Sequence, residues 1–267
     1  MQNVKNIAIL GAICGDIIGS TYEFHPTKSP DFPMLPPGSD FTDDTVMTCA
    51  VAEWLMTGED LVKTLQKWGQ LHADKGYGPL FLKWIWSDNP KPYNSYGNGA
   101  AMRVRAVGWY AQTLDECIEL ARQTAIVSHN HPEGIKGAQA VAMAVFMARA
   151  GSHKNQIKRI IAGKFDYDLA RSVENIRQIY TFDASCQGSV PEAIICFLES
   201  ENYESAVRLA VSLGGDADTM ACITGAIAGA YYREIPDDIV NHCLSLLSPD
   251  IPDIVSEFTN FLDSRKI

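Results

Sequence analysis

Three glycines recur at every fourth position near the start of the chain, at Gly11, Gly15 and Gly19 of "LGAICGDIIGSTYEF". Residues four apart lie on one face of a helix, and each glycine costs a helix about 1 kcal/mol relative to alanine. A helix without side chains on one face is approached closely there, most simply by a neighbouring backbone. Gly225 and Gly229 repeat this spacing in "ITGAIAGAYY". The pattern predicts two central helices packed tightly against their neighbours.

Helical periodicity extends over almost the whole chain, and alternating β-branched runs are few. Periodic segments suited to helices lie at residues 46–56, 61–71, 113–128, 132–150, 155–161, 170–181, 190–200, 203–213, 219–231 and 237–247. Residues 26–40 and 87–99 are rich in glycine, proline and asparagine, which favours long loops, and such loops are usually functional or disordered. We find no internal repeat or linker and predict one all-α domain over residues 1–267.

The composition limits the classes of partner. With 267 residues, of which 46% are hydrophobic, the chain can bury a substantial core. Its formal net charge of −10 argues against general nucleic-acid binding, which requires a basic face. A small anionic ligand is compatible with this charge, because metal ions can supply positive charge locally. The seven cysteines are odd in number and form no C-x-x-C pair, so we expect buried free thiols in a reducing cytosol.

The N-terminal sequence "MQNVKNIAILGAICGDIIGS" imitates two other signals. Lys5 and the apolar run after it are similar to a short signal peptide, but Asp16 interrupts the run. A dinucleotide-binding turn requires G-x-G-x-x-G, and the position two after Gly11 is Ile13. The longest uncharged apolar stretch, residues 219–232, is shorter than the ~20 residues that a membrane helix needs. We therefore expect a cytoplasmic protein with no membrane partner.

Two clusters of acidic and hydroxyl side chains each stand directly before an apolar helical segment. The first cluster, in "FTDDTVM", is Thr42, Asp43 and Asp44, and the second, in "GGDADTM", is Asp216, Asp218 and Thr219. Each cluster taken alone is explained by helix capping, because aspartate and threonine are favoured N-caps. Capping uses one side-chain oxygen per helix, however, and each cluster offers two carboxylates and at least one hydroxyl. The surplus oxygens favour a second role.

That role depends on whether the two helix starts meet. Four carboxylates brought together would repel by ~4 kcal/mol per pair at 4 Å and an effective dielectric of 20, and helix dipoles offset only ~0.3–1 kcal/mol per charge. Such a cluster protonates, moves apart or binds cations. Oxygen ligands without histidine or cysteine select hard divalent ions, Mg²⁺ first and Mn²⁺ or Ca²⁺ as alternatives. The clusters thus indicate the two halves of a dinuclear metal site.

Five motifs occur in order between residues 11 and 232: "GAICGDIIGSTYEF", "FTDDTVM", "YNSYGNGAAMRV", "SHNHPEGIKGAQAVAMAV" and "GGDADTMACITGAIAGAYY". Together they resemble the ADP-ribosylglycohydrolase family. The resemblance implies a single compact all-α, multi-helix orthogonal bundle with two Mg²⁺ ions, or Mn²⁺, at the base of a cleft that binds ADP-ribose. The metal ligands implied are Thr42, Asp43, Asp44, Asp216, Asp218 and Thr219.

The resemblance also assigns substrate and catalytic residues. The residues implied to hold the diphosphate and distal ribose are Ser95, Tyr96, Gly97, Asn98 and Gly99. Glycine-rich backbone can aim N–H groups at phosphate oxygens without a basic side chain, which agrees with this role. His129 matches a histidine that contacts substrate, and Glu23 matches a glutamate beside the scissile ribose. Asp218 and Glu23 are the two candidates for the general acid or base, and the sequence does not choose between them.

Some residues near these motifs have simpler interpretations. We expect His131 to be a loop-to-helix cap and Asp16 to serve helix packing or support the metal ligands. Arg105 is interpreted as a solvated side chain. The alternative is that it makes a cationic contact near the loop at residues 95–99, which we call the motif loop.

The aromatic residues near the motifs divide into core and candidate ligand contacts. Phe81, Trp84 and Trp86 have helical spacing, which is more typical of a core than of a ligand platform. Tyr96 and Trp109 lie closer to the motif loop, and either is a candidate to stack on adenine.

The implied reaction is hydrolysis at the anomeric carbon of ADP-ribose through an oxocarbenium-like transition state. The expected partner is an ADP-ribosylated protein, with arginine as the first acceptor and serine next, or a small ADP-ribosylated compound or nucleobase. Two alternatives remain: a metal-dependent ADP-ribose-binding protein without catalysis, and a dinuclear phosphohydrolase that releases phosphate. The acceptor stays open, because leaving-group contacts come from cleft-edge loops such as residues 26–40.

Overall fold

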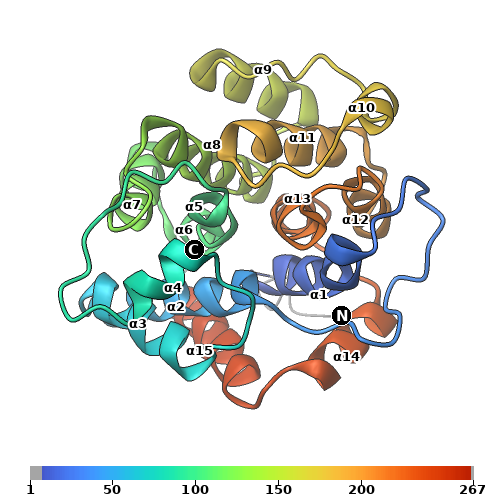
Figure 1. Cartoon of the computed structure of the whole chain (residues 1–267). Coiled ribbons are helices and arrows are strands. Elements are labelled where there is room, and N and C mark those ends of the chain that lie inside the picture. The colour runs from blue at the N-terminus through green and yellow to red at the C-terminus, as the bar shows by residue number, and fades with distance from the viewer. Residues whose placement is uncertain (1–7, 266–267) are drawn as a thin grey trace.

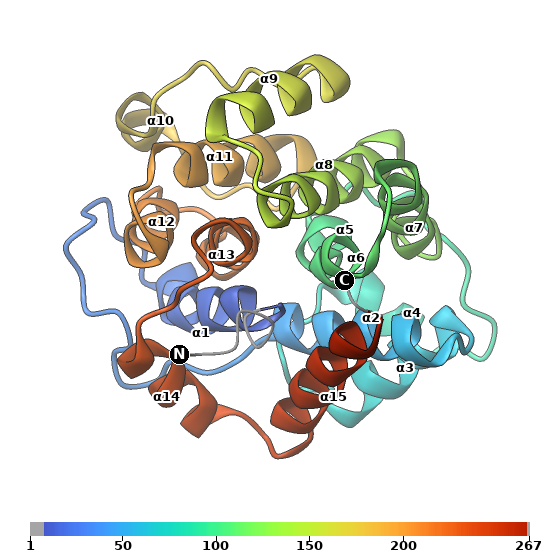
Figure 2. The ribbon, with the colours of Figure 1, turned by 180° about the vertical axis from the view of Figure 1, so that it is seen from behind.

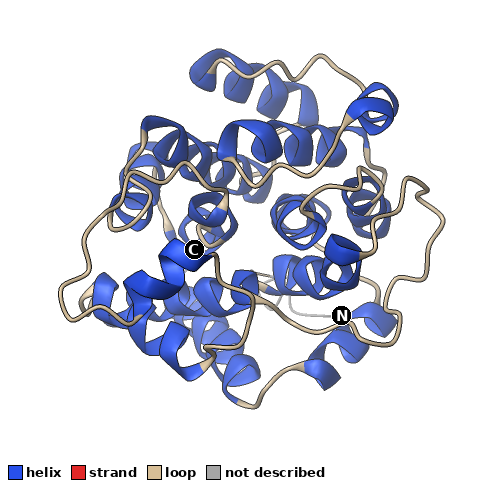
Figure 3. Cartoon of the chain, in the orientation of Figure 1, coloured by secondary structure: helices blue, strands red, loops and turns tan. Residues whose placement is uncertain are grey.

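The computed structural model describes residues 8–265, and within this range the chain forms fifteen helices and no strand (Figure 3). The helices are α1 (Leu10–Phe24), α2 (Asp43–Thr57), α3 (Leu61–Leu71), α4 (Pro79–Ile85), α5 (Gly99–Met102), α6 (Arg105–Tyr110), α7 (Leu114–Ile126), α8 (Pro132–Arg149), α9 (Lys154–Phe165), α10 (Val173–Ile179), α11 (Cys186–Glu199), α12 (Tyr203–Val211), α13 (Ala217–Tyr232), α14 (Asp237–Leu246) and α15 (Asp250–Ser264). The predicted all-α class is confirmed.

Helices α1 and α13 form the centre of the fold (Figures 1 and 2). Helices α8, α11 and α12 pack against α13, whereas α2 and α14 pack against α1. Helix α2 in turn contacts α3, α6 and α15, so the two central helices are enclosed by the others. None of the helices between residues 8 and 265 has the length and apolarity that crossing a bilayer requires.

The glycine spacing explains how closely α1 and α13 approach. A Cβ atom at Gly15 would lie 2.2 Å from the carbonyl oxygen of Ala221, and one at Gly19 would lie 2.3 Å from that of Ala217. Real Cβ atoms essentially never come within 3.0 Å of another heavy atom, so only glycine fits at these positions. The predicted backbone contact is confirmed. Since the two helices run antiparallel, the C-terminal end of α1 meets the N-terminal start of α13.

The ten segments predicted to be helical all contain helices, with shifts at their ends. The largest shifts are of four residues. Helix α9 ends at Phe165 and not at 161, and α11 begins four residues before the predicted 190 and carries Pro191 inside the helix, where we expected the boundary. Helices α4, α5, α6 and α15 were not among the ten predicted segments. Helix α15 has Pro252 in its first turn, which a helix tolerates because the first N–H groups have no intrahelical acceptor. Residues 87–98 form the expected loop, apart from a bridge between Gly97 and Ser185.

The long segment between α1 and α2 is tied to the body of the protein. The Tyr22 hydroxyl donates to the carbonyl of Pro33 at 2.6 Å, and Arg208 donates to the carbonyl of Phe32 at 2.8 Å. Lys28 donates to the carbonyl of Tyr180 at 2.6 Å. These contacts hold the segment between α1 and α2 against α1, α12 and the end of α10. The seven cysteines are buried and unpaired, as expected.

Candidate active site and metal centre

The start of α2 is held by a buried carboxylate from α1. Asp16 accepts hydrogen bonds from the backbone N–H of Thr42 at 3.0 Å, from the Thr42 hydroxyl at 2.7 Å and from the N–H of Thr45 at 3.1 Å, and the Thr45 hydroxyl also donates to it. Burial raises the pKa of Asp16, and the hydrogen bonds from the two threonines oppose that rise. This is the helix-packing role expected for Asp16. It fixes the direction in which the α2 carboxylates project.

Capping does not account for either acidic cluster. In α2 the N-cap is Thr42, whose hydroxyl accepts from the N–H of Asp44 at 3.3 Å, so Asp43 and Asp44 are surplus to the cap. In α13 the N-cap is Asp216, but its side chain makes no capping hydrogen bond. It accepts instead from the Asn98 amide at 2.7 Å. The carboxylates of Asp44 and Asp216 are therefore not used for capping, and they lie in the space between the two helix starts.

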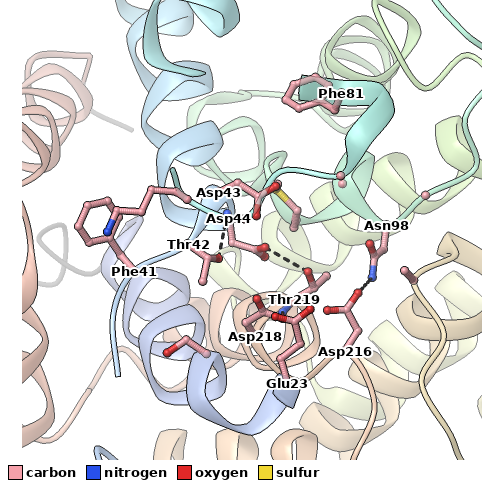
Figure 4. A pocket seen from close by; sticks show the side chains of 18 of the residues that line it. Glu23, Phe41, Thr42, Asp43, Asp44, Phe81, Asn98, Asp216, Asp218 and Thr219 are labelled. Carbon is pink, nitrogen blue, oxygen red and sulfur yellow. Dashed lines mark hydrogen bonds between the residues drawn. The ribbon is translucent and has the colours of Figure 1, made fainter. Parts of the chain in front are cut away.

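The two clusters meet across that space (Figure 4). The hydroxyl of Thr219 on α13 donates to Oδ2 of Asp44 on α2 at 3.1 Å. One carboxylate oxygen from each of Glu23, Asp216 and Asp218 lies within 4.8 Å of the other two. Residues 175 positions apart in the sequence thus share one acidic centre, because the α1–α13 contact brings α13's start beside α1's end.

This acidic centre lacks charge compensation from its nearest hydrogen-bond donors. The donors to Asp44 and Asp216 described above are a hydroxyl and an amide, both neutral, and Oδ1 of Asp44 is buried without a hydrogen-bond partner among the described residues. Burial raises the pKa of Asp43, Asp44 and Asp218, and the neighbouring carboxylates raise it further. Burial, with the charges of Asp216 and Asp16, raises the pKa of Glu23 to about 7.

These features fit hard divalent cations. A buried carboxylate oxygen without a partner and an all-oxygen donor set are what Mg²⁺ or Mn²⁺ requires. Positive charge at this position would also offset the mutual repulsion of the carboxylates.

The acidic centre forms part of the wall of a cavity of about 850 Å³. Every predicted site residue except Tyr96 lines the cavity, and the lining includes Glu23, Thr42, Asp43, Asp44, Ser95, Gly97, Asn98, Gly99, His129, Asp216, Asp218 and Thr219. A cavity of this size accommodates a ligand of several hundred daltons. The structure thus brings together the residues that the sequence singled out at five separate places.

The loop at residues 95–99 is fixed by the segment that precedes α11. The N–H of Asn98 donates to the carbonyl of Ala184 at 2.8 Å, and the N–H of Cys186 donates to the carbonyl of Tyr96 at 2.8 Å. Ser95 Oγ accepts from the N–H of Gly97 at 3.1 Å. The side chain of Tyr96 itself is exposed, its ring centroid 5.3 Å from that of His131. Tyr96 therefore contributes its backbone to this loop.

His129 is buried against this loop. Its Nδ1 lies 2.8 Å from the Ser128 hydroxyl, which itself accepts from the Arg103 guanidinium at 2.8 Å. The hydroxyl oxygen has two acceptor sites, so it can accept from Nδ1–H as well as from arginine, or donate its own proton to Nδ1. Burial and the charge of Arg103 lower the pKa of His129 and keep the ring neutral. Nε2 lies on the side of Gly99, so His129 presents this ring nitrogen to the loop and the cavity.

Arg103 is a lining residue that sequence reasoning missed. Its guanidinium is buried, donates to the carbonyl of Thr124 at 2.6 Å and lies 5.4 Å from the ring centroid of Phe81. Burial lowers its pKa to about 10, so it stays cationic at neutral pH. The signal in the sequence is its position four residues after Gly99, which places it at the end of the short helix α5.

Two expectations about neighbouring residues are wrong. Arg105 is not solvated: it is 1% exposed and donates to the Met102 carbonyl at 3.1 Å and the Cys222 sulfur at 2.7 Å. Trp109 is buried in the core and does not line the cavity, so it is not available to stack on adenine. Both side chains lie on α6, a short helix whose surroundings come from segments distant in sequence.

The aromatic cluster is partly core and partly cavity wall. Trp84 is buried as expected, whereas Trp86 is 59% exposed because α4 ends at the residue before it. Phe81 is buried and also lines the cavity, with its ring centroid 6.1 Å from that of His129. Tyr93 lines the cavity at 5.7 Å from the same ring. Two of the aromatic side chains that line the cavity, Phe81 and Tyr93, therefore lie at the His129 end. His131 caps α8 as expected, since its Nδ1 accepts from the N–H of Glu133 at 3.1 Å.

Between residues 8 and 265 the chain is helical, and its cavity is lined by carboxylates from two helix starts and by a glycine-rich loop that bonds to one of them. These features define a class of helical proteins with carboxylate-rich centres. The sequence model of the family described as ADP-ribosylglycohydrolase matches residues 7–264. The chain therefore belongs to the ADP-ribosylglycohydrolase family.

Curated relatives and a solved structure agree with this assignment. The chain is 28% identical to human ADP-ribosylhydrolase ARH3, over 91% of this chain and 90% of that protein. It is 27% identical to the mouse protein of the same name, over 91% and 88%. A solved structure described as "ADP-ribosylglycohydrolase-related protein complex" superposes with a TM-score of 0.75 at 25% identity and covers 98% of both chains.

Proposed function

We propose that the protein is a divalent-metal-dependent hydrolase that cleaves the N- or O-glycosidic bond between ADP-ribose and an acceptor, and releases ADP-ribose. The observation that carries this proposal is the meeting of the α2 and α13 starts, joined by the Thr219–Asp44 hydrogen bond, at the wall of a cavity that also contains the glycine-rich loop. We take residues 1–267 as one catalytic domain and expect it in the cytoplasm.

The residues proposed to hold two Mg²⁺ ions, with Mn²⁺ as the alternative, are Thr42, Asp43, Asp44, Asp216, Asp218 and Thr219. When bound, the ions supply positive charge that orients ribose hydroxyls and makes a water molecule more acidic. Asp16 keeps the α2 ligands in place through its bonds to Thr42 and Thr45. Asn98 does the same for Asp216.

The motif loop and His129 are proposed to hold the rest of ADP-ribose. The N–H groups of Gly97 and Asn98 already donate to the Ser95 hydroxyl and the Ala184 carbonyl, so those of Ser95 and Gly99 are the ones proposed to donate to the diphosphate. Nε2 of His129 adds a polar ring atom beside Gly99. Phe81 and Tyr93 then supply the apolar surface at the end where the adenine would lie.

Proton transfer falls to one of two carboxylates, Glu23 or Asp218. Asp218 is buried and accepts from the N–H of Thr219 at 2.8 Å, which restricts its movement. Glu23 is half-buried at the end of α1 and faces the cavity, so it can reach the leaving group or the attacking water. Cleavage requires a proton on the leaving-group atom and removal of one from water, and a carboxyl oxygen at this position can do both in turn.

Hydrolysis can be tested with ADP-ribosylated arginine and serine peptides, with and without Mg²⁺, by following the products by mass. The proposal predicts metal-dependent release of free ADP-ribose. Asp218→Ala should abolish turnover and weaken Mg²⁺ binding, while its circular dichroism spectrum keeps the wild-type helical content. Asp253→Ala, an exposed residue of α15 outside the cavity lining, is the matched control and should retain full activity.

Four results would contradict the proposal. Activity without metal, or activity that survives in Asp218→Ala, would remove the metal assignment. Release of AMP or phosphate would favour a phosphohydrolase. Tight binding of ADP-ribose without any turnover would favour a binding protein that has the fold but not the catalysis.

A further inference from the structure

One buried cation in the cavity wall is held by neutral groups alone. Arg103 is 1% exposed and lines the cavity. Its hydrogen bonds to other residues between 8 and 265 go to the carbonyl of Thr124 and the hydroxyl of Ser128. Its Nε is buried with no hydrogen-bond partner in the same range. A buried charge is costly unless it is paired, so this arrangement needs an explanation.

Support of α7 explains one of these two bonds. Thr124 lies in the last turn of α7, where carbonyl groups have no intrahelical donor and the helix dipole favours a cation. This role requires one donor at one carbonyl. It does not account for the bond from the same nitrogen, Nη2, to Ser128.

The bond to Ser128 leads to the ring of His129. Nη2 of Arg103 donates to Ser128 Oγ at 2.8 Å, and this Oγ lies 2.8 Å from Nδ1 of His129. We call these two successive bonds the Arg103–Ser128 link. Ser128 is fully buried, and its backbone carbonyl accepts from the N–H of Tyr93 at 3.1 Å. The link is therefore fixed to the segment that precedes the motif loop.

The link determines which atom of the ring faces the motif loop. Phe81 and Tyr93 pack beside His129, with ring centroids 6.1 and 5.7 Å from its own. Such packing does not distinguish an imidazole from the same ring turned over, because the exchange of nitrogen and carbon positions changes its shape little. The bond at Nδ1 makes this distinction, whichever atom carries the shared proton. It leaves Nε2 3.5 and 3.3 Å from Cβ atoms placed on Gly97 and Gly99.

We propose that Arg103 and Ser128 are positioning residues, which hold the His129 ring with Nε2 against the motif loop. This inference rests on the proposed function, since the ligand part that meets His129 there is the diphosphate and adenosine of ADP-ribose. Proton transfer is assigned to Glu23 or Asp218 in the acidic centre. The Arg103–Ser128 link therefore sets the affinity for ADP-ribose and not the rate of bond cleavage.

The test is a double-mutant cycle. The Kd of ADP-ribose with Mg²⁺ present, and kcat and KM for ADP-ribosylated arginine and serine peptides, are measured for wild type, Arg103→Met, Ser128→Ala and the double variant. Ser128→Ala removes one buried oxygen and leaves Arg103 bonded to Thr124, so it breaks the link without removing the support of α7. The control is Arg122→Met, a residue of α7 that bonds to Glu119 and does not line the cavity.

Loss of a hydrogen bond to a charged group changes an affinity by about tenfold or more. We expect each single variant to raise Kd and KM about tenfold and to keep kcat within about twofold of wild type. The double variant should bind no more weakly than Arg103→Met, because both changes break the same link. Arg122→Met should match wild type in every measurement.

Four results of the cycle would overturn the positioning role. Wild-type Kd in both single variants would mean that the link does not affect the ligand. A loss in Arg103→Met with none in Ser128→Ala would mean that Arg103 acts without His129. Losses that multiply to about a hundredfold in the double variant would mean two independent effects. A fall in kcat as large as the rise in KM would place the link in the chemical step.

NMR of ligand-free protein separates this inference from the proposed function. The charge of Arg103 contributes to the lowered pKa of His129, so this pKa should rise in Arg103→Met and stay unchanged in Arg122→Met. The sequence contains six histidines, and the spectrum of His129→Gln identifies the signal. If wild type neither binds nor hydrolyses ADP-ribosyl compounds, the proposed function fails. The titration then decides the link alone, and an unchanged pKa of His129 in Arg103→Met would overturn it.

Discussion

Removing divalent cations should affect the stability of the protein more at high pH than at low pH. One carboxylate oxygen from each of Glu23, Asp216 and Asp218 lies within 4.8 Å of the other two. If all three groups were charged, each pair at 4.8 Å would repel by about 3.5 kcal/mol at an effective dielectric of 20. Over three pairs this approaches the whole stability of an ordinary domain. Without cations, the folded protein therefore keeps protons on this centre.

Glu23 gives the size and the sign of the effect. The rise of its pKa from 4.5 to about 7 means that its contribution to stability is fully present below pH 4.5 and is lost as the pH rises through 7. A rise of this size corresponds to about 3.4 kcal/mol. Solvent screening at a half-buried side chain reduces this figure to roughly 1–2 kcal/mol. Cations replace the protons, so their stabilising effect should be larger by this amount at pH 8 than at pH 5.

Differential scanning calorimetry of metal-free protein, with and without saturating Mg²⁺, measures this difference. At roughly 2–4 °C per kcal/mol for a protein of this size, the rise in Tm caused by Mg²⁺ should be larger at pH 8 than at pH 5 by roughly 2–8 °C. Asp218→Asn should lose most of the Mg²⁺ effect, whereas Asp253→Asn should keep it. An equal rise at both pH values, or no rise at either, would refute the reasoning.

Three substitutions test the supporting structure. Gly15→Ala places a Cβ atom 2.2 Å from the Ala221 carbonyl oxygen and should cost at least ~1–3 kcal/mol in urea unfolding; wild-type stability would contradict the close contact of α1 and α13. Asp16→Asn puts an amide against the N–H donors of α2 and should cost about 1–3 kcal/mol of stability. It should also weaken Mg²⁺ binding in calorimetric titration, and unchanged metal affinity would count against the supporting role of Asp16. His131→Ala removes the α8 cap and should cost ~0.5–2 kcal/mol, with ADP-ribose affinity unaffected, and a large affinity loss would show that His131 is more than a cap.

The sequence predicted the parts of the structure that have a local cause. Three glycines spaced four apart remove the side chains from one face of a helix, and close approach of another backbone explains why. The contact of Gly15 with the α13 backbone therefore followed from the spacing. The oxygens at Asp44 and Asp216 exceeded what capping needs, and their surplus indicated a second role before the two helix starts were placed together.

The rest depended on packing between distant segments, which periodicity does not encode. Arg105 is buried because Ile9, Met102 and Cys222 surround its guanidinium, and nothing within its own short helix signals this. The Asn98–Asp216 bond, which positions one ligand, joins residues 118 positions apart.

The most direct measurement of the central claim is anomalous diffraction from crystals of the protein soaked in Mn²⁺. The account predicts two anomalous peaks in the cavity, within coordination distance of carboxylate oxygens from residues 42–44 on one side and residues 216–219 on the other. Mn²⁺ peaks elsewhere on the surface, with none between these two helix starts, would contradict it.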